Sequence, residues 1–364
     1  MKLALIRRQF SATGGAELYL QRLLAALAGR GHELHLFAES WCEFPAGTRL
    51  HPVSLAGDRA TRPLLFAEAV RTALAPEKFD CVFSLERTLR QDVYRAGDGV
   101  HRVWLQRRWQ FAPWWKKPFV GGGAFHQNLL ALEAQTFDPK HTRHIIVNSE
   151  MVKREILENF AFPAERIHLV RNGVDTARFQ NGRRAGTRKR FGVEDGEFLL
   201  LFAGSGWERK GLSFVLRAFS RLRKKNIRTR LLVAGKGHSP MVRPAGVIFA
   251  GPVQDMENIY AAADLLVFPP IYEPSANVVA EALAAGRPVI TSAQNGASEL
   301  IRAGINGSVV QNPADIQALF HAVSFWMERK TPAPVPVDAA ALSLERNVTE
   351  TLAVLELAAQ ENRA

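Results

Sequence analysis

The stretch LLVFPPIYEPSANVVAEALAAG, residues 265–286, decides the fold. Its first four residues, 265–268, are all apolar, which is typical of a strand buried on both faces. Three prolines within residues 269–274 stop such a strand and predict an irregular turn. Residues 275–285 are rich in helix formers and are closed by Gly286, so they predict a helix. A buried strand, a turn and a helix in this order indicate one unit of a parallel α/β sheet.

Two carboxylates of this stretch are candidate ligand-binding groups. Glu273 lies on the predicted turn and Glu281 lies inside the predicted helix. Both can face the crevice at the carboxyl ends of parallel strands, which is where open α/β sheets bind their ligands. A plainer interpretation is that Glu273 is solvated and that Glu281 is a helix charge that favours the dipole. The stretch alone leaves both interpretations open.

Strands and helices alternate in the same way along both halves of the chain. In the first half we expect strands at residues 2–8, 34–38, 50–55, 80–84, 144–149 and 167–170, with helices at 20–27 and 125–137. In the second half we expect strands at 198–203, 230–234, 247–250, 265–268 and 289–291, with helices at 212–224, 256–262, 276–285 and 313–328. This alternation predicts an α/β protein built on parallel sheets wrapped by helices.

The length of 364 residues suggests two domains of ordinary size. We expect an N-terminal Rossmann-like domain at residues 1–171 and a C-terminal one at 172–340. A basic stretch at residues 176–190 is expected to separate the two halves. Residues 341–364 hold a final amphipathic helix that can pack back on the first domain.

Composition limits the compartment and the partners. The net charge of +12 indicates an anionic partner, which could be nucleic acid, an acidic membrane or a phosphorylated substrate. Cys42 and Cys81 lie in or beside apolar runs without metal-ligand spacing, which favours buried thiols in a reducing compartment. No run is long enough to span a membrane, and residues 1–7 are too short for a signal peptide, so a cytoplasmic location is expected.

Gly14 and Gly15 lie between the first expected strand and the first expected helix. Glycines let the backbone approach a ligand closely, and a helix N-terminus favours anions. The third glycine of the dinucleotide fingerprint is missing, and no Lys-Ser/Thr pair follows, so neither standard phosphate motif is present. A tight strand-to-helix turn explains the pair equally well.

Arg209 and Lys210 follow the strand expected at 198–203 and are expected to begin a helix. The helix dipole disfavours cations at that end, so an anionic ligand there would offset the cost. A diphosphate would do so, through a charge-assisted contact to Arg209 and the point charge of Lys210. The alternative is a solvated cation pair.

Four motifs in this order resemble the signature of retaining family 4 glycosyltransferases of GT-B fold, over nearly the whole chain. They are Gly-Gly-Ala-Glu at 14–17, Asn-Gly-Val-Asp at 172–175, the pair Arg209-Lys210, and Glu273-x7-Glu281. The resemblance implies two Rossmann-like, doubly wound domains facing a central cleft. It also implies a nucleoside-diphosphate sugar bound mainly to the second domain.

The resemblance assigns roles within that donor site. Glu281 would accept hydrogen bonds from the ribose hydroxyls and Glu273 from hydroxyls of the donor sugar. Arg209 and Lys210 would stabilise the diphosphate as the glycosidic bond breaks. The remaining donor-site positions implied are Gly14, Gly15, Asn172, Ala276, Asn277 and Val278.

Asp98, flanked by Gly97 and Gly99, is the candidate acceptor-side residue, and His101 follows it. Family members that glucosylate lipopolysaccharide heptose are thought to contact the acceptor through an acidic residue in an equivalent segment. Many other members use a nearby histidine, and His101 is expected to titrate near neutrality. An aspartate in a glycine turn is more often structural, so the residues alone do not decide.

Residues 102–119 interleave aromatic and basic side chains and hold four of the seven tryptophans. Core packing explains such a mixture poorly, whereas tryptophan at the headgroup level with cations toward anionic lipid explains it well. Stacking of single-stranded nucleic acid is the alternative, and we favour the membrane. The acceptor and membrane candidates are His101, Trp104, Arg107, Arg108, Trp109, Trp114, Trp115, Lys116 and Lys117.

No Asp-x-Asp motif and no His/Cys cluster with zinc spacing occurs, so neither a metal nor a cofactor is expected. The sequence therefore predicts a metal-independent retaining hexosyltransferase, peripheral on the inner face of the bacterial cytoplasmic membrane. It would move glucose from UDP-glucose onto a heptose of the lipopolysaccharide core, a lipid-anchored glycan, with no nucleic-acid partner.

Two alternatives remain at this point. One is the same chemistry on a capsule, O-antigen or lipid-linked glycan acceptor. The other is a basic aromatic protein that binds nucleic acid or membrane without catalysis; such a binder has no need of Glu273 and Glu281 beside Arg209 and Lys210.

Overall fold

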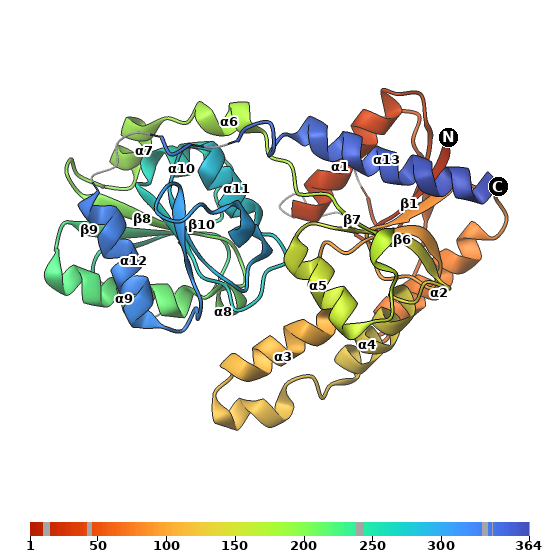
Figure 1. Cartoon of the computed structure of the whole chain (residues 1–364), viewed down its shortest axis with the longest axis horizontal. Helices are drawn as coiled ribbons and strands as arrows, with labels where there is room; N and C mark the ends of the chain where they lie inside the picture. Colours follow the sequence, from red (N-terminus) through yellow and green to blue (C-terminus); the bar gives the residue numbers. More distant parts are fainter. Residues whose placement is uncertain (10–14, 42–45, 238–243, 330–333, 337, 364) are drawn as a thin grey trace. The chain divides into compact units, whose positions relative to one another are not determined.

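The computed structural model divides into two compact units, Met1–Arg171 with Asn347–Ala364, and Asn172–Arg346. The chain is described at residues 1–9, 15–41, 46–237, 244–329, 334–336 and 338–363. Each unit has its own parallel sheet and its own buried apolar core (Figure 1).

The first unit is built on a seven-stranded sheet with the order β3-β2-β1-β4-β5-β6-β7. Every neighbouring pair is parallel. The order reverses between β1 and β4, which is the doubly wound arrangement. The strands are β1 (Lys2–Ile6), β2 (Glu33–Ala38), β3 (Arg49–Pro52), β4 (Cys81–Ser84), β5 (Gln91–Arg95), β6 (Thr142–Val147) and β7 (Ile167–Leu169).

Helices cover both faces of this sheet. On one face Leu3 of β1 shares a core with Leu24 of α1 (Gly15–Ala28) and Leu355 of α13 (Leu344–Arg363). On the other face Ile6 packs with Phe66 of α2 (Arg62–Leu74). Figure 1 shows α13 beside α1 and β1, although these segments come from opposite ends of the chain.

The candidate acceptor segment of this unit is helical and is held by one buried carboxylate. The chain forms α3 (His101–Phe111), the 3-10 turn η1 (Trp114–Phe119) and α4 (Ala124–Thr136). Glu133 of α4 accepts hydrogen bonds from the backbone N–H groups of His101 at 2.5 Å and Arg102 at 3.0 Å. It also forms an ion pair with Arg87 at 3.1 Å. Glu133 therefore caps the N-terminus of α3, where a negative charge is favoured.

The second unit holds a six-stranded parallel sheet with the order β10-β9-β8-β11-β12-β13. It reverses between β8 and β11, so the expectation of two doubly wound α/β sheets is confirmed. The strands are β8 (Phe198–Ala203), β9 (Thr229–Ala234), β10 (Val247–Gly251), β11 (Leu265–Phe268), β12 (Val289–Ser292) and β13 (Gly307–Val310).

Two pairs of helices pack against this second sheet. α9 (Leu212–Lys225) contacts α12 (Ile316–Glu328), and α10 (Met256–Ala262) contacts α11 (Asn277–Ala284). In Figure 1 the two pairs lie on opposite sides of the strands. No helix in the described part of the chain is both long and apolar enough to cross a bilayer.

The basic stretch at residues 176–190 corrects the sequence interpretation. It was expected to separate the two halves, but it forms α6 (Thr176–Gln180) and α7 (Arg184–Arg190), which belong to the second unit. A run of basic residues suggests a solvated linker, yet Arg178, Arg184 and Arg188 all have partners on the neighbouring helix α10.

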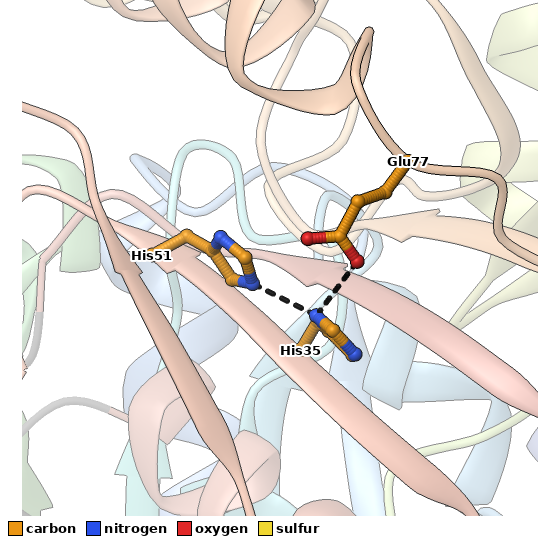
Figure 2. Close-up of side chains that lie close together, drawn as sticks. All are labelled: His35, His51 and Glu77. Atoms are coloured by element: carbon orange, nitrogen blue, oxygen red, sulfur yellow. Dashed lines mark hydrogen bonds and ion pairs between the residues drawn. The ribbon is translucent and has the colours of Figure 1, made fainter.

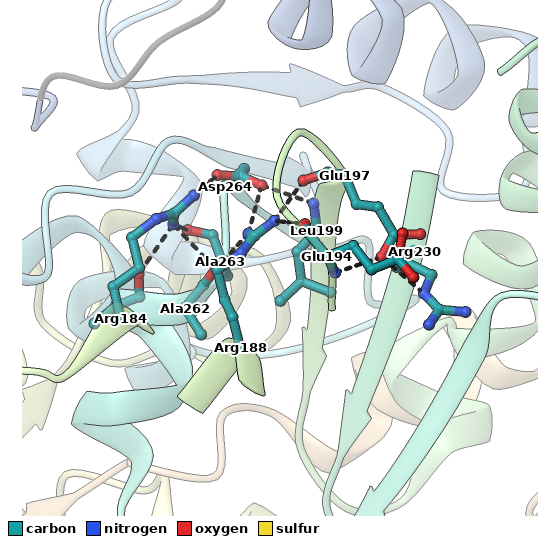
Figure 3. A network of polar contacts seen from close by, with 10 residues as sticks. Arg184, Arg188, Glu194, Glu197, Leu199, Arg230, Ala262, Ala263 and Asp264 are labelled. Atoms are coloured by element: carbon teal, nitrogen blue, oxygen red, sulfur yellow. Dashed lines mark hydrogen bonds and ion pairs between the residues drawn. The ribbon is translucent and has the colours of Figure 1, made fainter. Parts of the chain in front are cut away.

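Figure 3 shows the partners of Arg184 and Arg188. Arg184 donates to the backbone oxygens of Ala261, Ala262 and Ala263 at 3.0–3.1 Å, and Arg188 donates to Ala262 O at 3.1 Å. The carboxyl end of α10 thereby receives the donors that a helix C-terminus lacks. Both arginines also pair with Asp264, the residue just before β11. The basic charge thus fixes α7 to the sheet.

Candidate active site

The donor-site candidates follow β8 and β11, the two strands between which the order of the second sheet reverses. One loop leads from β8 into the one-turn helix α8 (Trp207–Lys210), and the other leads from β11 through Glu273 into α11. The carboxyl ends of neighbouring parallel strands open a crevice at such a reversal. The structure therefore places Arg209, Lys210, Glu273 and Glu281 at one edge of one unit.

The position of the two cations corrects the sequence expectation. Arg209 and Lys210 do not begin the long helix but end α8, and α9 begins at Leu212. Gly211 separates the two helices with a φ of +79°, and a Cβ at this position would lie 2.0 Å from Pro269 O. Only glycine fits at this position. The apolar pattern of the sequence did not indicate that the helix is interrupted here.

Arg209 joins the two loops. Its Nη1 lies 2.8 Å from Glu273 Oε2 in an ion pair and donates a hydrogen bond to Tyr272 O at 3.3 Å. Its carbonyl accepts a hydrogen bond from Ile271 N at 2.9 Å. The Glu273 side chain is 15% exposed, so a bound ligand could reach a carboxylate that is already oriented.

Lys210 is a partly desolvated cation. Its Nζ lies 5.6 Å from the centre of the Phe268 ring, and its side chain crosses the backbone of Gly204. Burial lowers the pKa of Lys210, while the carboxylates of Glu273 and Glu281 act in the opposite direction. The carboxylates do not fully compensate the buried ammonium, so an added anion would be favoured beside it.

Glu281 is held by a phenol. Its Oε2 accepts a hydrogen bond from Tyr260 of α10 at 2.8 Å. Burial raises the pKa of Tyr260 well above its ordinary value, so the hydroxyl stays protonated and donates. The two helices α10 and α11 are thereby joined at the residue for which a ribose contact is expected.

Asn172 meets the start of α11. Its side-chain amide donates to Asn277 Oδ1 at 2.8 Å and to Ser275 O at 3.3 Å. Ala276 is the residue before the helix, and Asn277 and Val278 are its first two residues. The structure thus gathers these four donor-site candidates at the N-terminus of α11.

Asn295 is a residue that sequence reasoning missed. It is fully buried, and its Oδ1 accepts hydrogen bonds from Ala276 N and Ala297 N, each at 3.1 Å. Its Nδ2 donates to Thr291 Oγ1 at 2.9 Å, and the next residue donates its N–H to Glu273 O at 2.9 Å. Asn295 therefore positions the loop that carries Glu273. The Asn-Gly pair at 295–296 is a turn signal, but such pairs are too common to indicate this role.

A cavity of about 350 Å³ lies at the carboxyl ends of β8, β9 and β10, and it was not expected either. Trp207 and Phe249 form its aromatic walls, with ring centres 5.7 Å apart. Gly237 packs so closely on Trp207 that a Cβ would lie 2.3 Å from the indole. The lining residues are Trp207, Gly235, Lys236, Gly237, Phe249, Ala250, Gly251 and Pro252.

In the first unit Asp98 is exposed on the turn that follows β5. Gly99 has a φ of +71°, and its carbonyl accepts a hydrogen bond from Arg87 at 2.8 Å. Asn148, at the end of β6, donates to Gly97 O at 3.2 Å. Both neighbours fix the turn, so Asp98 is presented at the carboxyl edge of the first sheet.

His101 does not match the expectation that it titrates near neutrality. It is buried at the start of α3, and its Nε2 lies 3.1 Å from Nδ1 of His126. Burial, with help from Arg87 and His126, lowers the pKa of His101 to about 4. The imidazole is therefore neutral at neutral pH.

The aromatic and basic segment lies on the surface. Trp114 is 79% exposed and Phe119 is 80% exposed, and Trp109 and Trp115 are also exposed. Lys117 Nζ lies 4.2 Å from the centre of the Trp109 ring. Trp104, Arg107 and Arg108 are half-buried along α3, and Lys116 is exposed on η1.

Several further residues lie apart from these candidates. Ser149 begins α5 (Glu150–Asn159) as its N-cap, with Val152 N donating to its Oγ at 3.3 Å. Cys81 is a buried free thiol. Gly15 is the first residue of α1, whereas Gly14 and Cys42 lie outside the described residues.

Comparison with known proteins agrees with this organisation. Residues 13–178 match the domain family described as Glycosyltransferase Family 4, and residues 197–329 match the one described as Glycosyl transferases group 1. Two doubly wound sheets are also the architecture expected of a GT-B protein. This chain belongs to the glycosyltransferases that combine these two domains.

Relatives of known sequence are distant. A D-inositol 3-phosphate glycosyltransferase of Thermobifida fusca is 26% identical over 383 aligned residues, which cover 93% of this chain and 88% of that protein. An uncharacterized glycosyltransferase of Methanocaldococcus jannaschii is 28% identical over 213 residues, and there the match spans about half of each protein, 54%.

Solved structures match over the full length. WaaG, a glycosyltransferase involved in lipopolysaccharide biosynthesis, gives a TM-score of 0.76 at 22% identity, covering 99% of this chain and 98% of WaaG. Anabaena HepE, in complex with UDP and glucose, gives a TM-score of 0.74 at 18% identity, covering 98% and 99%. These likenesses confirm the GT-B fold.

Proposed function

We propose that this glycosyltransferase is a metal-independent, retaining hexosyltransferase that moves glucose from UDP-glucose onto a heptose of a lipopolysaccharide core. It works at the inner face of the bacterial cytoplasmic membrane. The observation that carries the donor half is the meeting of Arg209, Lys210 and Glu273 at the order reversal of the second sheet. Two cations and an oriented carboxylate suit a diphosphate joined to a sugar.

In this proposal each part of the nucleotide sugar is bound by a different set of side chains. Arg209 and the desolvated Lys210 bind the diphosphate, and their attraction grows as negative charge develops on the leaving group. Glu273 accepts hydrogen bonds from the sugar, and Glu281, held by Tyr260, accepts them from the ribose. The cavity lined by Trp207 and Phe249 receives the nucleobase, because aromatic side chains give a flat ring a surface on which to pack.

The acceptor half rests on the exposed aromatic segment. Trp109, Trp114, Trp115 and Phe119 are exposed beside Lys116 and Lys117, which suits a surface of anionic lipid. Asp98 precedes this segment along the chain and is exposed at the carboxyl edge of the first sheet. A protein that docks there would meet acceptors that are embedded in the membrane. A soluble acceptor would give these indoles no such role.

A direct assay tests the proposal. The purified chain is incubated with UDP-glucose, UDP-galactose or GDP-mannose, each with a heptose-terminated lipopolysaccharide core, a capsule or O-antigen precursor, or inositol 3-phosphate. We expect nucleotide release to be fastest with UDP-glucose and the heptose-terminated core, and the product to keep the anomeric configuration of the donor.

The other outcomes are equally informative. Preference for inositol 3-phosphate, the acceptor named for the Thermobifida fusca relative, would replace the acceptor assignment and keep the donor site. Transfer to a different lipid-linked glycan would do the same. No transfer with any donor would leave the non-catalytic binding protein as the better explanation.

A further inference from the structure

Two histidines and a glutamate meet in the first unit, whereas Arg209, Lys210, Glu273 and Glu281 belong to the second. His35 lies in β2, His51 in β3, and Glu77 between α2 and β4, and one ligand atom from each lies within 4.8 Å of the others (Figure 2). Asp98 follows the carboxyl end of β5, whereas Glu77 precedes the amino end of β4. We propose that this His2Glu cluster binds one transition-metal ion, with Zn²⁺ as the physiological candidate.

His35 uses Nε2 for a hydrogen bond to Glu33, which leaves Nδ1 directed at His51 and Glu77. Its Nε2 lies 2.8 Å from Glu33 Oε1, and a carboxylate only accepts, so Nε2 carries the proton. The lone pair of Nδ1 then faces His51 Nε2 at 2.8 Å and Glu77 Oε2 at 3.8 Å. Metal-binding histidines commonly place their other N–H on a carboxylate in this way, which fixes the tautomer and the ring orientation.

Aromatic neighbours hold both rings in place. Phe37 stacks on His51 at 4.4 Å between ring centres, and Phe79 meets His35 edge-on at 5.1 Å. His35 is 1% exposed. A cluster with fixed rings loses little conformational freedom on binding.

The distances between the candidate ligand atoms are close to those of a tetrahedral zinc site. Zn–N bonds of about 2.0–2.1 Å in a tetrahedral site place neighbouring ligand atoms roughly 3.3 Å apart. The present distances of 2.8 Å and 3.8 Å from His35 Nδ1 lie on either side of that value. All three ligand atoms lie within 4.8 Å of one another, and the Glu77 side chain is 27% exposed, so it has room to adjust toward the two rings. Three protein ligands leave the fourth position to water.

In the metal-free protein, the ammonium group of Lys2 supplies the positive charge beside Glu77 and Glu33. Its Nζ lies 2.8 Å from Glu77 Oε2 and 3.7 Å from Glu33 Oε1, and its side chain is 31% exposed. On metal binding the ammonium moves into solvent, and His51 shifts its proton from Nε2 to Nδ1. No proton leaves the protein in this exchange. Lys2 and the more distant Arg49 therefore oppose the metal, which makes the affinity adjustable by mutation.

The test uses the full chain without a histidine tag. Co²⁺ is titrated while the visible absorption of a tetrahedral site is recorded, and Zn²⁺ is then measured by competition with a chromophoric chelator. We expect one ion per chain, with binding weakened by at least about tenfold in His51→Ala and by roughly tenfold in Glu33→Gln. Lys2→Met is expected to tighten binding, a gain that a folding defect cannot produce.

His168→Ala is the matched control. His168 pairs with His144 at 3.0 Å, is likewise partly buried, and has a pKa lowered by burial. If His168→Ala abolishes Co²⁺ binding and His51→Ala does not, the assignment is wrong. It is also wrong if Lys2→Met binds no tighter than wild type, since the cluster would then be only an ion-pair network.

Chelation separates this inference from the proposed transferase. Because the cluster shares no residue with the donor-site candidates, EDTA should lower the Tm of the metal-loaded protein and leave the rate of glycosyl transfer unchanged. An unchanged Tm counts against the metal site alone. A lost rate that returns with magnesium counts against the metal-independent transferase alone.

Discussion

Glu273 and Arg209 form an ion pair of 2.8 Å between Oε2 and Nη1, and this pair joins the loop after β8 to the loop after β11. The two residues are separated by more than sixty positions in the sequence, and they meet because β8 and β11 are neighbours in the sheet. A carboxylate that neutralises Arg209 in the free protein also aims the guanidinium. The arrangement therefore bears directly on catalysis.

Replacing Arg209 or Lys210 with alanine should lower kcat much more than it weakens donor binding. Negative charge on the diphosphate grows as the glycosidic bond breaks, so each cation stabilises the transition state most. The expected loss is about 10²–10³-fold in kcat, or roughly 3–4 kcal/mol. Steady-state kinetics with UDP-glucose measure it, and Arg217→Ala on the exposed side of α9 is the control. A loss confined to KM would mean uniform binding instead.

Glu281→Ala should raise the donor KM, because charge-assisted hydrogen bonds to the ribose are lost. The cost is on the order of 1.5–3 kcal/mol. Tyr260→Phe removes only the hydroxyl group that donates to the Glu281 carboxylate at 2.8 Å. Its effect on KM should be smaller, about 0.5–1.5 kcal/mol. Isothermal titration with UDP provides the direct check, and wild-type affinity in Glu281→Ala would rule out the ribose contact.

Vesicles that contain anionic lipid should pellet the wild-type chain, and added salt should weaken this binding because charge attraction is screened. Replacing Arg107, Arg108, Lys116 and Lys117 with serine should reduce pelleting and leave donor affinity unchanged. Each cation near the surface contributes roughly 1 kcal/mol. The matched control replaces four exposed basic residues of α9 with serine: Arg217, Arg221, Lys224 and Lys225. Equal pelleting of both variants would remove the membrane from the proposal.

Glu133→Ala should destabilise the first unit. Glu133 is 1% exposed, caps the backbone of His101 and Arg102, and pairs with Arg87. Its removal leaves a buried guanidinium without its carboxylate, at a cost of about 3–5 kcal/mol. Differential scanning calorimetry should show a lower Tm, while the exposed Glu165→Ala should show almost none of this change. A wild-type Tm for Glu133→Ala would contradict the capping role.

The stability of the first unit should fall between about pH 6.5 and pH 4. His101 has a pKa of about 4 in the folded protein, below the ordinary value of about 6.5. The unfolded chain therefore binds this proton first as the pH drops. The contribution of neutral His101 is complete above pH 6.5 and is lost progressively down to pH 4. Denaturant unfolding across this range measures the slope, and His101→Gln should flatten it.

The sequence was sufficient for much of the fold. Uniformly apolar runs such as residues 265–268 identify strands buried on both faces, and the structure places β11 there. It did not reveal β5 or β13, because Gln91–Arg95 contains polar residues and Gly307–Val310 begins with Gly and Ser, so neither is a uniformly apolar run. The helix α7 was missed because basic residues normally indicate solvent. Here they bond to the carbonyls that end α10.

Sequence motifs identified the donor-site residues, but they did not reveal contacts between segments that are distant in the sequence. Glu273 and Glu281 stand in one short stretch with a recognisable spacing. Asn295 positions the same loop from the turn that follows β12, and the Asn-Gly pair there is too common a signal to indicate this role. The cluster of His35, His51 and Glu77 escaped for the same reason. Its members are sixteen and twenty-six positions apart; the pairing of β2 with β3 brings the two histidines together, and the segment between α2 and β4 adds Glu77.

The helix α13 has a consequence for synthesis of the protein. Residues 347–363 pack on the first sheet, although residues 172–346 form the other unit. As the chain leaves the ribosome, the second unit is complete before the first, because all of its strands are contiguous in sequence. The N-terminal sheet emerges early, but the apolar face that α1 covers in part is not fully covered until Leu352 and Leu355 arrive. Domains usually complete their folding in the order of synthesis; here the order of completion is reversed.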